Sequence, residues 1–330
     1  TFTIGGTSPD FATFTAAITF LESTGICDTT WIMVRPGTYT EQLTIPWISG
    51  ASSSQIIFRA ENGDSSSVIL QFDPTTTNKH VVRFNNAAGI TWERMTINAL
   101  GTDFGRVFQF DVNSFNNTIQ HCAINGINTS STSNSFSCIY ADNSFSDNLI
   151  RHNTIKNGSY GIQHAFSSNN KKSFEVRSNR IENFSSMGLQ FPNVSGLQVH
   201  GNTIISAKNN VVGIEVAGDN DTLDISSNKI ELSSGWIGIK LDECTPAGNA
   251  RANLSNNMVY INHASAFVYG IYCFYTERTN IFQNTTKVSG PNVESAAFLL
   301  NESFQDSVFN NLFTSFGNGM TFYVGATDQT

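Results

Sequence analysis

Residues 197–204 read Leu-Gln-Val-His-Gly-Asn-Thr-Ile, and a pattern of the same form recurs along most of the 330-residue chain. Each copy has an apolar residue, two small or polar residues, an asparagine, one further residue and a second apolar residue. Copies follow one another at intervals of about 23 to 31 residues, and Met95 and Cys122 take the asparagine slot in two early copies. Repeats of this length predict stacked units, because one repeat cannot bury its own apolar face. The asparagines are Asn153, Asn179, Asn202, Asn228, Asn257, Asn284 and Asn311.

A second pattern, glycine-apolar-x-apolar, follows each asparagine motif after a stretch of variable length. Its alternation predicts a short strand with one face inward and one outward. With one strand on each side of the asparagine, a repeat contains about three short strands and no helical period. We therefore expect an all-β, right-handed parallel β-helix with coils of about 27 residues. The glycines of this second pattern are Gly161, Gly188, Gly213, Gly238, Gly270 and Gly319.

The repeated asparagine has two expected roles. It is expected to tolerate the left-handed backbone of a sharp turn. Stacked in every coil, its side-chain amides are also expected to form a hydrogen-bonded ladder. A sandwich or barrel is disfavoured because hairpin turns of the Asn-Gly kind are scarce.

Residues 1–60 differ from the repeats and are expected to cap the solenoid, while residues 61–330 form the coils of one continuous domain. Apolar residues between Phe11 and Leu21 predict a helix over about 9–22, with Ser8 as the N-cap candidate and Pro9 near the first turn. A helix here would cover the open end of the core. Residues 31–34 and 39–45 then read as the first strands.

Composition limits the possible partners. The chain is 13% charged with a net charge of −8, and Lys171-Lys172 is its one basic cluster, so nucleic acid is not an expected partner. No segment has the length and apolarity of a transmembrane helix. The five cysteines are expected to be buried thiols. His121 next to Cys122 suggests a metal, but further ligands at matching spacing are missing, so we expect no metal and no cofactor.

Three segments near the start of the chain carry a resemblance to a known family: Thr3-Ile4-Gly5-Gly6, Ser8-Pro9-Asp10-Phe11 and Val34-Arg35-Pro36-Gly37-Thr38-Tyr39-Thr40-Glu41. They resemble the start of secreted β-helix proteins of the pectate-lyase-like superfamily, particularly large surface proteins of Bacteroidetes-type bacteria exported by type IX secretion. The resemblance implies export to the cell surface or medium, polysaccharide-rich surroundings and a larger multidomain parent. The signatures of polygalacturonases, pectin methylesterases and calcium-dependent pectate lyases are absent.

The residue two positions after each motif glycine is expected to point outward, so these residues form a column along the solenoid. Amides, charges and tyrosine rings in a flat array suit a carbohydrate chain, although such a column is also what any solvated sheet face would present. The proposed glycan-binding residues are Tyr140, Gln163, Gln190, Glu215, Lys240 and Tyr272. The column is expected to begin at Arg83 and Gln109 and to end at Leu299 and Thr321.

Within this column, Glu215 and Lys240 are expected side by side on adjacent coils, with Asp242 diagonal to Glu215. Lys240 could abstract a proton next to a uronate carboxyl, as in a lyase. Alternatively, two carboxylates roughly 7–9 Å apart could serve an inverting glycosidase. The sequence thus leaves two functions open. The favoured one is a secreted or cell-surface module that binds polysaccharide or acts as an adhesion or spacer rod. The alternative is a polysaccharide lyase or glycoside hydrolase that uses these three residues.

Overall fold

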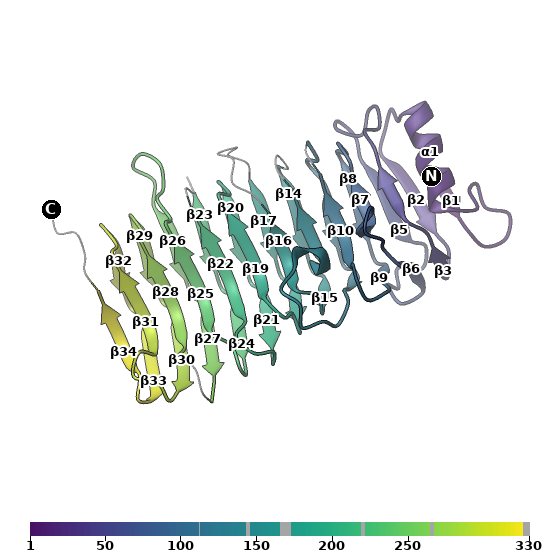
Figure 1. Ribbon diagram of the computed structural model, residues 1–330. Helices are drawn as coiled ribbons and strands as arrows, with labels where there is room; N and C mark the ends of the chain where they lie inside the picture. The colour runs from purple at the N-terminus through teal and green to yellow at the C-terminus, as the bar shows by residue number, and fades with distance from the viewer. Residues whose placement is uncertain (112, 143–145, 166–172, 219–221, 265–266, 326–330) are drawn as a thin grey trace.

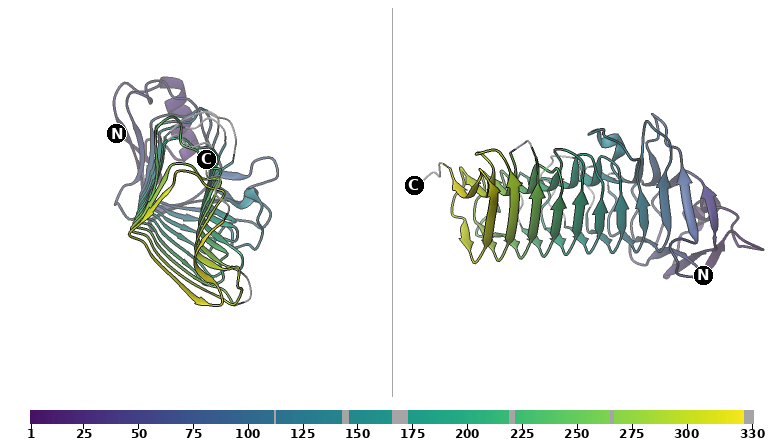
Figure 2. Two further views of the ribbon diagram at one scale, coloured as in Figure 1. Left: turned by 90° about the vertical axis from the view of Figure 1, so that its left-hand side faces the viewer. Right: turned by 90° about the horizontal axis from the view of Figure 1, so that it is seen from below.

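The computed structural model describes residues 1–111, 113–142, 146–165, 173–218, 222–264 and 267–325, so Lys171-Lys172 lies outside the described residues. The described chain is an all-β, right-handed parallel β-helix, as predicted (Figure 1). Each coil contributes one strand to each of three sheets, which form the walls of the solenoid seen end-on in Figure 2. Three strands per coil are therefore confirmed.

The three sheets are named here A, B and C. Sheet A comprises β1 (Phe2–Ile4), β2 (Thr30–Val34), β5 (Ile56–Ala60), β8 (Ile90–Glu93), β11 (Thr118–Gln120), β14 (Asn148–Arg151), β17 (Phe174–Arg177), β20 (Leu197–His200), β23 (Leu223–Ser226), β26 (Ala252–Ser255), β29 (Thr279–Phe282) and β32 (Ser307–Phe309). Sheet B comprises β3 (Gly37–Thr40), β6 (Val68–Phe72), β9 (Thr96–Ala99), β12 (Ala123–Asn125), β15 (Thr154–Lys156), β18 (Arg180–Glu182), β21 (Thr203–Ser206), β24 (Lys229–Leu232), β27 (Met258–Asn262), β30 (Thr285–Gly290) and β33 (Leu312–Gly317). Sheet C comprises β4 (Leu43–Ile45), β7 (His80–Phe84), β10 (Arg106–Phe110), β13 (Ile139–Ala141), β16 (Tyr160–His164), β19 (Met187–Pro192), β22 (Val212–Ala217), β25 (Ile237–Asp242), β28 (Tyr269–Phe274), β31 (Ala296–Asn301) and β34 (Met320–Val324).

The seven repeated asparagines stack inside the corner between sheets A and B. The Oδ1 of Asn202 accepts from the backbone N–H of Asn179 at 2.9 Å and from its Nδ2 at 3.1 Å. The Nδ2 of Asn202 donates in turn to Oδ1 of Asn228 and to the carbonyl of Val176. Each amide thus satisfies buried groups of the preceding coil and donates to the amide of the next. The same Oδ1 contact to the next coil joins Asn153, Asn179, Asn202, Asn228, Asn257, Asn284 and Asn311.

The expected left-handed backbone of these asparagines is wrong. The residue before each asparagine carries the positive φ, for example 55° at His152, 55° at Ser178 and 61° at Gly201. That residue turns outward at the corner, where solvent accommodates any side chain. The asparagine must instead point inward to reach its partners, so its role is hydrogen bonding.

The motif glycines allow adjacent coils of sheet C to pack closely. A Cβ added to Gly213 would lie 2.5 Å from the carbonyl oxygen of Gly238 and 2.8 Å from a methyl group of Ile230. The two strands pair in register on either side, with Val212 opposite Ile237. Glycine is therefore required at Gly213 because there is no room for a side chain.

The N-terminal helix α1 runs over Phe14–Thr24 rather than the expected 9–22, and Thr13 is its N-cap. Ser8 and Pro9 precede it by several residues, and Phe11 forms a bridge with Ile4. α1 buries an apolar face, and the Phe14 ring stacks on Trp92 with centroids 5.5 Å apart. The helix lies at the N-terminal end of the solenoid in Figure 1. β2, β3 and β4 already supply one strand to each sheet, so coil-type strands begin well before residue 61.

Candidate functional site on sheet C

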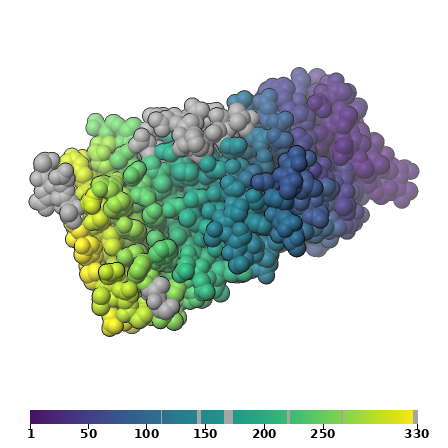
Figure 3. All heavy atoms as spheres, in the orientation of Figure 1, coloured from purple at the N-terminus to yellow at the C-terminus, as the bar shows by residue number. Residues whose placement is uncertain are grey.

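The outward column lies on sheet C, whose strands are in front in Figure 1. Figure 3 shows the same face as a continuous surface of side chains. The pairing register aligns Gln190 with Glu215, Glu215 with Lys240 and Lys240 with Tyr272. The expected order of the column therefore holds over these coils. At its C-terminal end Leu299 pairs with Tyr323 and not with Thr321. The prediction of Thr321 is wrong because Gly319 lies two residues before the position that the other motif glycines occupy.

Side chains of the column are hydrogen bonded to one another along the solenoid axis. Gln163 donates to Gln190 at 2.9 Å, and Gln190 donates to Glu215 at 2.9 Å. Lys240 then donates to Glu215 at 3.1 Å and to Asp242 at 2.6 Å. The column is thus a pre-organised polar row in which each side chain is held by its neighbours.

Two members of the predicted binding set are not accessible. Tyr140 and Gln163 are only 8% and 7% exposed. The connection 126–137, which contains the short 3-10 helix η1 (Asn134–Phe136), covers this part of the column. Ser137 from this connection donates to Gln163 at 2.8 Å, and Arg106 stacks on the Tyr140 ring at 3.4 Å from its centroid. The accessible part of the predicted binding set therefore begins at Gln190.

Segment 126–137 reaches across several coils. The Ser131 carbonyl accepts from Ser185, and Lys208 donates to Asn128 at 3.0 Å. These contacts fasten the segment along the corner between sheets B and C. The second long connection, 242–251, lies between sheets C and A, where Arg278 donates to the Pro246 carbonyl. Neither connection lines the two pockets described below.

The charged centre of the face consists of Glu215, Lys240 and Asp242, which the structure brings together as expected. Burial disfavours the charged form of Lys240, but the hydrogen bonds and charges of Asp242 and Glu215 outweigh it and raise its pKa. A lysine with a raised pKa is a poor proton acceptor near neutral pH. The contacts of 3.1 and 2.6 Å to one Nζ place the two carboxylate oxygens closer together than the about 6.5–9.5 Å between carboxyl groups that an inverting glycosidase needs for its water.

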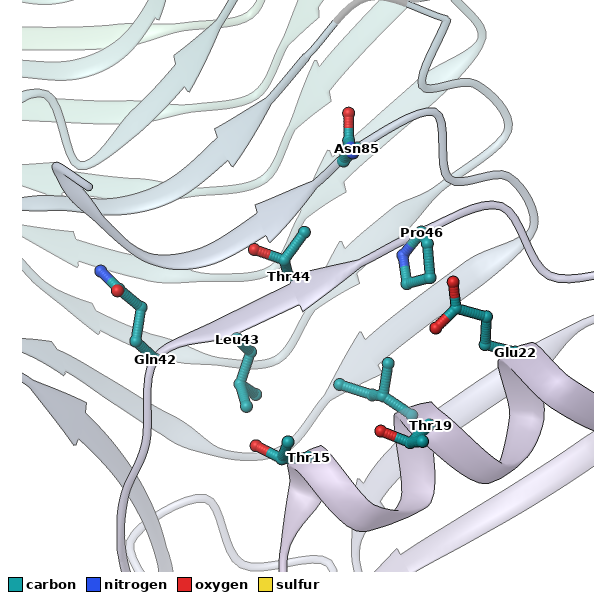
Figure 4. A pocket seen from close by; sticks show the side chains of 9 residues that line it. Thr15, Thr19, Glu22, Gln42, Leu43, Thr44, Pro46 and Asn85 are labelled. Carbon is teal, nitrogen blue, oxygen red and sulfur yellow. The ribbon is translucent and has the colours of Figure 1, made fainter. Parts of the chain in front are cut away.

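Two pockets lie outside the column. One, of about 450 Å3, opens between α1 and β4, where Thr19 and Glu22 of the helix face Pro46 (Figure 4). It borders the head of the column, because Thr44 on its wall pairs with Arg83. The other, of about 270 Å3, lies on sheet A beside Glu175 and Gln198. Neither contains the candidate catalytic residues.

The other titratable residues singled out in the sequence have surroundings typical of structural residues, not of a catalytic or metal site. Burial raises the pKa of Cys122 to about 12, and its backbone N–H donates to Asn153. His121 is exposed, so the neighbouring pair does not form one site. Burial lowers the pKa of His164 to about 4. Within the described ranges, no three His, Cys, Asp or Glu side chains are grouped as a metal site would require. None of the described helices has the length and apolar character needed to cross a bilayer.

Sequence reasoning missed a set of aromatic residues beside Tyr272. Tyr269 and Phe274 lie on the same strand, β28, and Trp236 precedes β25. The spacing Tyr-x-Phe at 272–274 places these two rings on the outward face, whereas strand alternation does not predict that Tyr269 joins them. A column read along the axis takes one residue per coil, so it cannot show a group that runs across the sheet.

Comparisons with known proteins give likeness of structure but not of sequence. No family model matches the chain, and no curated protein matches it. The Dettilon tailspike protein aligns with a TM-score of 0.52 at 13% identity, over 89% of this chain and 62% of the tailspike chain. This chain thus spans less than two thirds of the tailspike protein, and the likeness is one of fold. The mannuronan C-5 epimerase AlgE6 A-module of Azotobacter vinelandii aligns at 10% identity over 96% of this chain and 94% of its own, with a TM-score of 0.49. PfbA, a surface adhesin of Streptococcus pneumoniae, aligns at 12% identity over 94% of this chain and 89% of its own, with a TM-score of 0.48.

Proposed function

We propose that the chain is a secreted or cell-surface module that binds polysaccharide, or adheres to a glycan-bearing surface, without cleaving it. The observation that carries this proposal is the accessible row on sheet C from Gln190 to Tyr272. In it amide, carboxylate, ammonium and phenol groups stand in parallel on a rigid sheet. Such groups can exchange hydrogen bonds with sugar hydroxyls, and a tyrosine ring offers an apolar face for the sugar ring. Because the sheet fixes their positions, little conformational freedom is lost on binding.

The same geometry weakens the catalytic alternative. A lyase would need Lys240 unprotonated, whereas two carboxylates stabilise its charged form. A hydrolase would need Glu215 and Asp242 to flank a sugar, whereas Lys240 contacts both of them. Lys240 is therefore proposed to hold the two carboxylates in place for binding. Export by type IX secretion and membership of a larger multidomain protein belong to the same proposal.

A panel of neutral and uronate-rich polysaccharides tests the proposal. The purified chain is incubated with each glycan, and reducing ends, unsaturated products and retention in affinity gels are measured. We expect retention without product. Turnover that disappears in Lys240→Ala or Glu215→Ala would replace the binding function with the enzyme. Failure to retain any glycan would remove the polysaccharide-binding function.

A further inference from the structure

The aromatic residues beside Tyr272 form a continuous row, named here the aromatic row. Neighbouring ring centroids lie 5.6, 6.1, 5.2, 6.0 and 4.3 Å apart along it. The row follows β28 across the width of sheet C and so runs at right angles to the polar column, which it crosses at Tyr272. In order, its members are Trp236, Phe267, Tyr269, Tyr272, Phe274 and Tyr275.

Solvent reaches this row at both ends. Trp236 is 38% exposed and Tyr275 is 45% exposed, while the rings between them are half-buried. Large aromatic side chains at the surface usually bury most of their area, because apolar contact with water is unfavourable. Six rings in contact on one outward face are therefore an apolar strip suited to a flat, extended partner.

The polar groups beside the row determine which partner fits. The charges of Glu294, Asp242, Glu302 and Glu243 act on its three tyrosines, and Lys240 is the one cation among these neighbours. Lys240 is itself already bound to Glu215 and Asp242. An added carboxylate would thus meet net negative charge, as well as the negative faces of the rings.

From this arrangement we propose that the aromatic row is the binding site of an uncharged polysaccharide chain, which lies across sheet C along β28. This inference rests on the proposed polysaccharide-binding function and assigns its ligand class. Sugar rings stack by their C–H faces on Tyr269, Tyr272 and Phe274. Asp242, which pairs with Phe274 on the adjacent strand β25, accepts hydrogen bonds from hydroxyl groups at the edge of the chain. Polyuronates are excluded by the surrounding carboxylates.

Native affinity gels test this with soluble neutral probes (a mixed-linkage glucan, a galactomannan and a xylan) and with polygalacturonate and alginate. We expect retention by at least one neutral probe and none by the polyuronates. Tyr272→Ala should weaken that retention about tenfold or more, as loss of an aromatic anchor does, and Tyr272→Phe should preserve it. The matched control is Tyr260→Ala, an exposed tyrosine on sheet B that is 41% exposed. Trp236→Ala provides a second variant should Tyr272→Ala fail to fold.

The outcomes separate this inference from the proposed function. Retention of a polyuronate as strong as that of the neutral probes would overturn the ligand class and leave polysaccharide binding intact. Neutral retention that survives both Tyr272→Ala and Trp236→Ala would overturn the site and again leave the function intact. Light scattering that shows a dimer lost in Tyr272→Ala would make the row a self-association surface and overturn the inference. No retention of any probe would overturn both.

Discussion

Replacing Asn202 with alanine removes one member of the buried ladder near the middle of the solenoid. Asn202 is fully buried, and its side chain serves three partners besides the next ladder amide. After truncation, the backbone N–H of Asn179 loses its acceptor and the carbonyl of Val176 loses a donor. The Nδ2 of Asn179 keeps a second bond to Ile150, and Oδ1 of Asn228 keeps the backbone N–H of residue 202.

Two buried backbone groups are therefore left without these partners. Each such group costs about 1–3 kcal/mol, so the free energy of unfolding should fall by about 2–6 kcal/mol. The neighbouring coils are held by the same ladder, which limits how far they can shift to compensate.

Urea unfolding followed by circular dichroism measures this loss from the shift in midpoint and slope. The matched control is Gln198→Ala on β20, the strand that precedes Asn202, where the side chain is exposed and the change should stay within about 0.5 kcal/mol. Asn311→Ala tests the same substitution at the exposed end of the ladder. Its side chain accepts from Asn284 but is partly exposed at the end of the ladder, so water can replace it and the loss should be smaller. A loss for Asn202→Ala no larger than that for Gln198→Ala would refute the role assigned to the ladder.

Three further changes test the packing. Gly213→Ala should lower the free energy of unfolding by about 1–3 kcal/mol, because the added methyl group forces the coils apart. The control is Gly248→Ala, whose added Cβ meets nothing within 4 Å and should cost only left-handed backbone strain. Equal melting temperatures for the two variants would contradict the close approach at Gly213. Phe14→Ala should cost about 3–5 kcal/mol by removing the helix contact with Trp92, and a change below 1 kcal/mol in urea would show that α1 does not cap the core. The pKa of His164 is depressed in the folded chain to about 4 from 6.5, so its neutral form contributes stability that is complete above pH 6.5 and declines as pH falls to about 4. His164→Phe should reduce the total acid-side loss of unfolding free energy across that window by an amount on the order of 3 kcal/mol. An unchanged loss in urea titrations at several pH values would contradict this.

Much of the fold was predictable because the asparagine motif and the glycine motif recur with nearly constant strand lengths. In a parallel β-helix, strands of successive coils pair at a fixed spacing, so a repeat in sequence becomes a neighbour in space. That rule predicted the ladder from Asn153 to Asn311 and the alignment of Glu215 with Lys240. It failed at Gly319, where the copy of the motif is displaced by two residues from its slot.

Features set by irregular segments were not predictable in this way. Segment 126–137 belongs to a connection longer than the others between sheets B and C, and its contacts with Ser185 and Lys208 two or more coils away bury Gln163 beneath it. The sequence also did not show which residue of each corner takes the left-handed backbone. That depends on which side chain turns inward, and a pattern of residue types does not reveal it. The aromatic row depended on side chains meeting across one strand and its corners. Sequence alone determined which residues stack along the axis, because backbone pairing imposes that order. Tertiary structure decided which of them meet solvent and which join across a coil, because loop paths and side-chain packing are not repeated from one coil to the next.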